Sequence, residues 1–370
     1  MNGNATLRLL PFLLASLFLF GCGTPNTPVG PQPPSDYFDV LNVLETRGNA
    51  LDLDLEGDSL YVAENSAGVG FYDVSDPAAI TLTHHLPTSE AIELVDAVPE
   101  MNALFVHNGS INHIYLLDSL DNGQITSLGS SGVNTILTHI TTDSVKSLNF
   151  EDAETVETDV IRTLICDKNS GDGLQVYTVW LDSTDDVVFP LDTLSIFSRV
   201  EKMNLDWSGI EEAGAETIAG FDTVAISLHD YGVAFADISK EVEDQDGVWL
   251  SDINTPGDAQ GLAYSDGYLY VADGYAGLSV IDAQDVTAPV FVANRRIKNL
   301  DHAIKVFVKD DQLVLMDQFD GFFFYDISTP EAPDYQGSYE IREPTSAVFV
   351  DDDMMILASV SEGLTTIKFK

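Results

Sequence analysis

Carboxylates and histidines recur where short apolar runs of this chain end. Eight of them are candidates for ligand binding, six at the ends of such runs and two in the segments between them: Glu64, His107, Asp167, His229, Asp273, Asp317, Asp258 and His302. If the fold gathers these side chains around one point, they can bind a cation or a basic or hydroxylated ligand. The same residue types also form solvated turns, and that interpretation stays open.

Signatures of catalysis are missing from the sequence. It contains no His-Glu-x-x-His, no Gly-x-Ser-x-Gly and no phosphate-binding glycine loop. Cys166 lies in an apolar run and is followed by Asp167, whose charge disfavours a thiolate. We therefore expect Cys166 to be a small buried hydrophobe and predict no catalytic residue.

An internal repeat indicates which elements position the candidate residues. Three segments share one order of features: a short apolar strand, a turn around a glycine, a second strand, and an aspartate that ends it. They are residues 60–77, 269–285 and 313–330, with turn glycines Gly68, Gly277 and Gly321 and closing aspartates Asp73, Asp282 and Asp326. The Pro and Ser residues that follow are turn signals.

Weaker copies bring the number of strand pairs to seven. Their first strands begin near residues 61, 105, 164, 224, 270, 314 and 356. Most intervals are about 42 to 46 residues, which matches a four-stranded propeller blade. Two intervals of about 60 residues predict insertions in blades three and four, at about residues 133–255.

The two ends of the chain indicate how the ring closes. The sequence stops at Lys370, directly after the second strand of the last pair, so that blade needs an outer strand. Residues 37–45 have the required pattern, and pairing them there would remove an open sheet edge. The predicted fold is therefore an all-β β-propeller of about seven four-stranded blades, closed by the N-terminal strand.

Two stretches resemble a known repeat family. YVADGYAGLSVIDAQDVTAP and LVLMDQFDGFFFYDISTPEAP are similar to the LVIVD repeat of bacterial surface and lipoprotein β-propellers. The resemblance implies a propeller fold and an exported location. It implies no established activity.

The N-terminus carries an export signal. Leu9–Phe20 is too short to cross a bilayer and fits the apolar region of a secretory signal. The following residues, Leu19-Phe20-Gly21-Cys22, resemble a bacterial lipobox, which implies acylation of Cys22; a plain signal peptide with a chance cysteine is the alternative. Gly23 after the cysteine implies the outer membrane, with the body periplasmic or at the cell surface.

The predicted organisation is accordingly a lipoprotein signal peptide at residues 1–21, a proline-rich tether at 22–35 and one propeller domain at 36–370. We expect a monomer that contacts the membrane through its lipid anchor.

Charge excludes some partners. Sixty acidic against sixteen basic residues give a formal net charge of −44, which repels nucleic acid. The acidity favours general solvation of the surface, and calcium binding is the alternative. No other cofactor is predicted.

Three functions remain open. The first is a non-catalytic scaffold at the cell envelope that binds a protein or glycan; the others are a metal-assisted hydrolase or lyase at the acidic tunnel mouth, and a calcium-dependent adhesin. An enzyme requires a histidine and two carboxylates around one point. A scaffold needs an exposed aromatic patch instead.

Overall fold

The computed structural model describes residues 36–109, 111–118, 120, 126–129, 133–146, 155–167, 174–181, 196–199, 214–218, 222–238, 248–296 and 300–370. Between residues 126 and 199 it describes the strands, but only Ile161 and Thr163 among their side chains. The predicted signal peptide and tether, including Cys22, lie outside these ranges. In the described part of the chain, no helix is long and apolar enough to cross a membrane.

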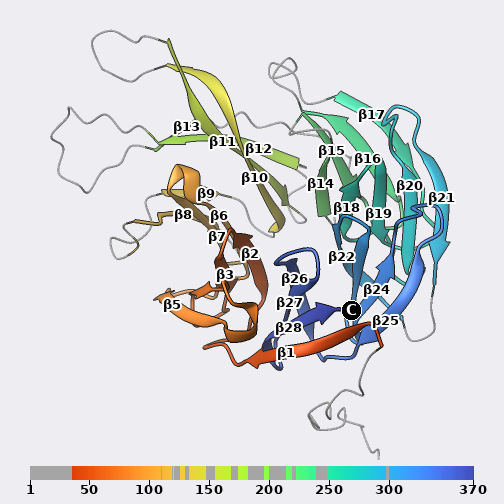
Figure 1. The fold of residues 1–370 in the computed structure, drawn as a ribbon. Coiled ribbons are helices and arrows are strands. Elements are labelled where there is room, and N and C mark those ends of the chain that lie inside the picture. The colour runs from red at the N-terminus through yellow and green to blue at the C-terminus, as the bar shows by residue number, and fades with distance from the viewer. Residues whose placement is uncertain are drawn as a thin grey trace, which may run out of the picture.

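The described elements form a β-propeller of four-stranded antiparallel blades, which confirms that part of the prediction (Figure 1). Seven four-stranded sheets are present. The first three are β2 (Asp52–Glu56), β3 (Ser59–Ala63), β4 (Val69–Asp73), β5 (Thr81–Leu86); β6 (Leu94–Val98), β7 (Ala103–His107), β8 (Ile111–Leu116), β9 (Thr126–Gly129); and β10 (Val133–Lys146), β11 (Thr155–Asp167), β12 (Leu174–Leu181), β13 (Ile196–Arg199).

The next three sheets follow the same order along the chain. They are β14 (Gly214–Ile218), β15 (Thr223–Ser227), β16 (Val233–Asp237), β17 (Val248–Ile253); β18 (Leu262–Ser265), β19 (Tyr268–Ala272), β20 (Leu278–Asp282), β21 (Val290–Arg295); and β22 (Ala303–Lys309), β23 (Gln312–Asp317), β24 (Gly321–Asp326), β25 (Asp334–Tyr339). Short 3-10 helices η1 (Pro77–Ala79) and η2 (Pro99–Met101) lie in loops. Six of the seven sheets have described side chains in at least three strands, and β10–β13 does not.

The remaining sheet, the terminal sheet, combines both ends of the chain. It contains β26 (Pro344–Phe349), β27 (Met354–Ser359) and β28 (Gly363–Phe369), with β1 (Phe38–Leu44) antiparallel to β28 as its fourth strand. Phe38 is paired with Phe369 and is 4% exposed. Its ring centroid lies 5.2 Å from that of Phe324 and 6.0 Å from that of Tyr339, so β1 anchors the terminal sheet against β22–β25.

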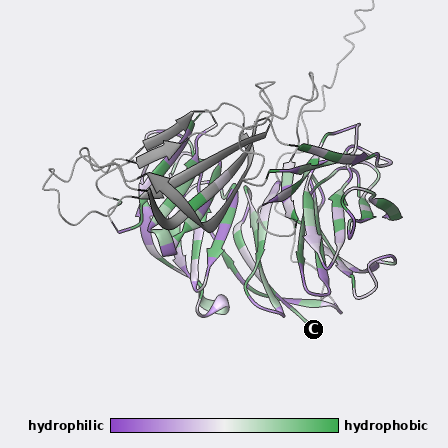
Figure 2. Cartoon of the chain, turned by 90° about the horizontal axis from the view of Figure 1, so that it is seen from above, coloured by the Kyte–Doolittle hydropathy of each residue, from purple (hydrophilic) through white to green (hydrophobic). Residues whose placement is uncertain are grey.

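Neighbouring sheets bury apolar side chains between them. One buried cluster joins β18–β21 to β22–β25 and includes Tyr270 and Phe323, while the next joins β22–β25 to the terminal sheet and includes Phe322 and Met355. Strands alternate hydrophobic and hydrophilic segments, as Figure 2 shows. The core is therefore a series of layers between blades.

The first strand of each sheet lies at the axis and contacts the first strands of its neighbours, as β2 contacts β6 and β26 (Figure 1). In five sheets the outer strand carries a register shift against its partner. Such bulges twist an exposed edge away from pairing with another chain.

The predicted insertions lie within residues 133–255, much of which falls outside the described ranges. Part of the extra length is a longer hairpin: β10 has 14 residues and β11 has 13. Elsewhere in the described chain, strands have four to eight residues.

Replacing Phe38 tests the contribution of β1. Phe38→Ala should lower the free energy of unfolding by about 3–5 kcal/mol, because it leaves a cavity between two sheets. Val43, on the same strand, is 50% exposed. Val43→Ala should change the free energy of unfolding by less than about 0.5 kcal/mol. Urea titration of both variants measures the two effects. Equal effects of the two substitutions would show that β1 is not anchored through Phe38.

Candidate functional site

Three of the predicted ligands are buried carboxylates at the ends of second strands. Glu64, Asp273 and Asp317 are each 0% exposed. They lie beneath the face that carries the turn between the second and third strands of each sheet and the links between sheets, which we call the link face. The oxygens of Asp273 and Asp317 accept hydrogen bonds within the protein, and whether any of the three carboxylates binds a ligand at this face stays a prediction.

Asp317 shows the arrangement in its fullest form. Its Oδ2 accepts hydrogen bonds from the backbone N–H groups of Asp301, at 2.9 Å, and His302, at 2.6 Å, in the link before β22. Its Oδ1 accepts from the N–H groups of Phe319 and Asp320, at 2.8 and 3.1 Å, in the turn after β23. One carboxylate therefore joins a link to a turn and leaves none of these donors unsatisfied.

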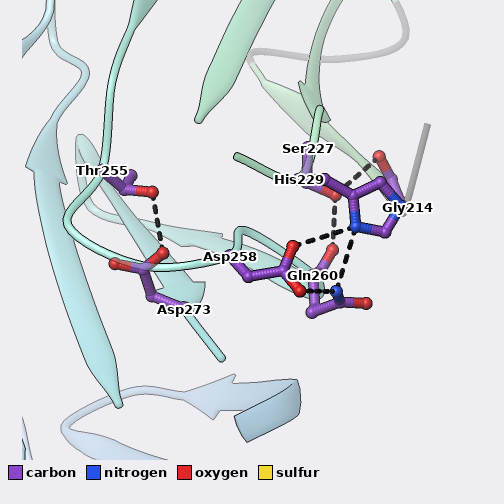
Figure 3. A network of polar contacts seen from close by, with 7 residues as sticks. All are labelled: Gly214, Ser227, His229, Thr255, Asp258, Gln260 and Asp273. Carbon is purple, nitrogen blue, oxygen red and sulfur yellow. Dashed lines mark hydrogen bonds and ion pairs between the residues drawn. The ribbon is translucent and has the colours of Figure 1, made fainter. Parts of the chain in front are cut away.

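Asp273 connects the preceding link to the third strand of its own sheet, β18–β21, and Figure 3 shows its bond to Thr255 in that link. Its Oδ1 accepts from Thr255 Oγ1 at 2.7 Å, and its Oδ2 accepts from Ser279 Oγ at 2.7 Å and from the Gly257 N–H at 3.1 Å. Burial raises the pKa of Asp273, and these hydrogen bonds oppose the rise. A Cβ at Gly257 would lie 2.1 Å from the Asp273 carbonyl oxygen, so only glycine permits this approach.

Glu64 completes the set with a different partner. Its Oε1 accepts a hydrogen bond from the Tyr72 hydroxyl, and its Oε2 lies 3.6 Å from Nε2 of His85. Burial raises the pKa of Tyr72 most, and this hydrogen bond raises it further. Gly70 makes room, because a Cβ there would lie 2.6 Å from Glu64 Oε1. His84 packs on Phe71 instead, so the two adjacent histidines face opposite sides of β5, as strand geometry predicts.

A second group of predicted residues does meet at the link face. His229 Nδ1 lies 2.9 Å from Asp258 Oδ1, and Gln260 Nε2 donates to Asp258 Oδ2 at 2.8 Å (Figure 3). The side chains of His229 and Asp258 are 37% and 25% exposed. An imidazole whose Nδ1–H is held by a carboxylate is oriented with Nε2 as its other functional atom. His229 itself has a positive φ of 52°, the conformation that Asn65 and Gly274 adopt at the matching turns.

The turn of the sheet β6–β9 contains a separate polar group. His107 is buried, and its Nδ1 lies 3.1 Å from Asn112 Oδ1. The Asn108 amide donates to Glu90 and lies 3.1 Å from His113 Nε2. His107 is thus a core residue of this sheet rather than part of the His229 group.

The remaining predicted residues do not complete a cation site. His302 is half-buried, and it contributes its backbone N–H to Asp317. Asp167 is the last residue of β11, and its side chain lies outside the described residues. Across the described ranges, no group of three or more His, Cys, Asp or Glu side chains is placed to hold a metal ion.

Acidic residues along the axis were not singled out by sequence patterns. Asp52 and Asp54 on β2 accept from the N–H groups of Val95, at 3.3 Å, and Ala97, at 2.7 Å, on β6. These donors lie on the axial edge of β6, so one sheet caps the open edge of the next. Burial raises the pKa of Asp54 to about 7, with Glu56 and Asp52 adding to the rise and the Ala97 bond opposing it.

Sequence patterns also did not single out the exposed aromatic side chains at the link face. Tyr231, Tyr275 and Phe319 are 63%, 51% and 63% exposed and lie in the second-to-third strand turns of three consecutive sheets. The available signal was an aromatic residue one or two positions before the turn glycine in these three copies of the repeat. Most other exposed large hydrophobics in the described chain lie on outer strands.

Comparison with known proteins agrees with the repeat assignment. Residues 47–88 and 256–295 match the LVIVD repeat, so the expected resemblance is confirmed for two copies. No curated protein sequence matches the chain.

Solved structures support the fold alone. The computationally designed Ika8 protein is similar with a TM-score of 0.55 and 11% identity, over 89% of this chain and 99% of that chain. A chain in a crystal structure of the mitotic checkpoint complex is similar with a TM-score of 0.55 and 12% identity, over 99% of both chains.

Asp317→Ala tests the structural assignment of the buried carboxylates. It should lower the free energy of unfolding by about 3 kcal/mol or more, because four backbone N–H groups lose a charged acceptor. Gln318, the next residue, is exposed, and Gln318→Ala should change stability by less than about 0.5 kcal/mol. Denaturant unfolding of both variants measures these two changes in stability. An Asp317→Ala protein as stable as the wild type would show that Asp317 is not needed for the fold.

Asp54 should make stability depend on pH. Its folded pKa of about 7 exceeds the ordinary value of 3.8, so the folded state holds the proton more tightly. That stabilisation is fully present below about pH 3.8 and is lost as the pH rises through about 7. Asp54→Asn keeps an acceptor for Ala97 and should reduce the loss of stability between pH 5 and 8 by on the order of 1–2 kcal/mol.

The matched control for this titration is Asp58→Asn in the adjacent exposed turn, which should keep the wild-type pH dependence. An unchanged profile for Asp54→Asn would show that Asp54 titrates normally.

Proposed function

We propose that this LVIVD-repeat propeller is an exported, lipid-anchored scaffold of the cell envelope that binds a protein partner through its link face without catalysis. The lipobox-like residues around Cys22 support the anchor and the outer-membrane address. In this proposal the seven sheets act as one rigid ring closed by β1, an arrangement supported by the pairing of β1 with β28 and by the contact of β26 with β2.

The observation that carries the proposal is the exposed aromatic set Tyr231, Tyr275 and Phe319, which we call the aromatic arc. Exposed aromatic side chains on neighbouring turns of one face mark interaction sites, because binding removes a large apolar area from water at a small entropic cost. Tyr275 is held by its hydroxyl, which donates to the Pro256 carbonyl oxygen at 3.2 Å in the adjacent link. The ring is therefore presented in a defined position before a partner arrives.

The spread of the arc favours a protein over a glycan as the partner. Its members lie on three separate sheets, which suits a broad contact with aromatic anchors. Carboxylates accompany them on the same turns and links, among them Asp230, Asp258 and Asp320. Burial raises the pKa of Asp320 most, and the nearby carboxylates of Asp317, Asp301 and Glu340 raise it further. A partner with a basic surface complements this charge.

A metal-assisted hydrolase or lyase is the second candidate, and the His229–Asp258 pair is the observation in its favour. An imidazole oriented by a carboxylate is an arrangement that general bases use. This pair provides one of the two carboxylates that such a site needs. A calcium-dependent adhesin is the third candidate, and it would engage its partner only with calcium present.

Site-specific photo-cross-linking in cells that make the full chain tests the leading proposal. A photoreactive amino acid at position 275 should give a discrete adduct in the membrane fraction. Tyr231→Ser with Phe319→Ser should reduce this adduct at least about fivefold, since each lost aromatic contact contributes on the order of 1 kcal/mol. Cys22→Ser should move the adduct to the soluble fraction.

The matched control places the same photoreactive group at Tyr335, which is 40% exposed on the outer strand β25 and should give no such adduct. Equal adducts at positions 275 and 335 would contradict the link-face proposal. An adduct that appears only with added calcium would favour the adhesin.

A further inference from the structure

The turn between β7 and β8 contains the dipeptide Asn108-Gly109. The backbone nitrogen of a glycine can attack the side-chain amide of the asparagine before it, because no Cβ hinders the approach. This turn packs against the link between β5 and β6, where the Glu93 N–H donates to the His107 carbonyl oxygen at 2.7 Å. The link is therefore held in place beside the dipeptide.

Hydrogen bonds orient both polar atoms of the Asn108 side chain. Its Oδ1 accepts from the backbone N–H of Ile111 at 2.8 Å. Its Nδ2 donates to Glu90 Oε2 and lies 3.1 Å from His113 Nε2. A backbone N–H aimed at a carbonyl oxygen stabilises the negative charge that develops there during attack on the carbonyl carbon. The amide nitrogen, which would leave in such an attack, meanwhile faces an imidazole and a carboxylate.

Gly109 has a carboxylate beside its backbone. Its φ is +80°, and an added Cβ would lie 2.9 Å from Glu93 Oε1. The Glu93 carboxylate thus lies against the residue that carries the attacking nitrogen. A carboxylate in this place can act as a general base and accept the proton that the nitrogen loses.

His113 is positioned for the opposite role. It is 8% exposed, and its Nδ1 is buried without a hydrogen-bond partner among the described residues, so its polar contacts are made by Nε2. This Nε2 lies 3.7 Å from Glu90 Oε2, which also accepts from Asn108. A histidine in contact with a leaving amide nitrogen can act as a general acid and convert it to ammonia.

We propose that Asn108 is a self-modifying site, at which the folded chain converts its own side-chain amide into a carboxylate. The Gly109 nitrogen attacks Asn108 Cγ, loses its proton to Glu93 and closes a succinimide ring. The bond from Cγ to Nδ2 breaks, and Nδ2 leaves as ammonia with a proton from His113, which solvent restores from Glu93. Water then opens the ring at either carbonyl, giving aspartate or isoaspartate, so the net reaction is hydrolysis of one amide.

The product changes the charge of this part of the link face. A carboxylate at position 108 no longer donates a hydrogen bond to Glu90, and it adds a negative charge beside Glu90 and Glu93. Like charges this close repel each other. Conversion should therefore loosen the turn from the link. The reaction needs no partner, so it is independent of the proposed function.

Incubation of the purified full chain at neutral pH tests the proposal, with peptide mapping by mass spectrometry as the readout. The reference is a synthetic peptide of residues 104–114, which contains the dipeptide but lacks Glu90 and Glu93. Asn108 should convert at least about tenfold faster in the folded chain than in the peptide, since general acid–base groups contribute about 10²–10⁴-fold. Both aspartate and isoaspartate should form.

Variants identify the groups that move the protons. Glu93→Gln and His113→Gln should each slow conversion at least about fivefold. The matched control, Glu100→Gln, removes an exposed carboxylate beyond the other end of β6 and should keep the wild-type rate. Thermal unfolding establishes that each variant is folded. Unfolding the wild-type chain in urea makes the comparison without a substitution and should lower the rate to that of the peptide.

Conversion no faster in the folded chain than in the peptide would overturn the proposal, as would wild-type rates in both Glu93→Gln and His113→Gln. Aspartate as the sole product would show direct hydrolysis and contradict the succinimide route. The link-face cross-linking measures a different property, so neither experiment decides the other.

Discussion

A buried carboxylate at the end of a second strand holds the link face of this propeller in shape. Asp317 binds two N–H groups of the preceding link and two of the following turn, and Asp273 joins the preceding link to the third strand, β20, in the neighbouring sheet. A buried carboxylate, shielded from water, forms strong hydrogen bonds with several backbone N–H donors. The sheets β18–β21 and β22–β25 are thereby each attached to the chain segment that arrives from the sheet before.

The exposed groups depend on this attachment in two ways. Tyr275 and Phe319 each lie two residues after a buried carboxylate, Asp273 or Asp317, and are exposed in the turn that follows it. The same links place Asp258 and Gln260 against His229, whose left-handed backbone conformation continues the repeat geometry of Asn65 and Gly274. The link face therefore consists of a base of buried charge with a variable set of side chains above it.

Acidic residues serve at least three physical roles in this chain. Some fasten links to turns, as Asp317 does. Asp52 and Asp54 satisfy N–H groups on the axial edge of the next sheet, where burial raises the pKa of Asp54. Others lie in exposed turns, where Asp73 and Asp285 accept backbone N–H groups and have a lowered pKa. Part of the net charge of −44 thus comes from residues with separate local roles.

The sequence by itself determined the all-β propeller and its four-stranded unit, because strand period, turn glycines and closing aspartates repeat along the chain. It also predicted that Tyr37–Glu45 forms a strand, and residues 38–44 pair with β28. Only the tertiary structure decided which polar residues are buried and which reach the surface. Asp258 and Asp317 are both candidate ligands by sequence, yet one is partly exposed and the other is enclosed by four N–H groups. Whether a carboxylate meets solvent or a backbone donor depends on contacts between segments far apart in the chain, which local patterns do not contain.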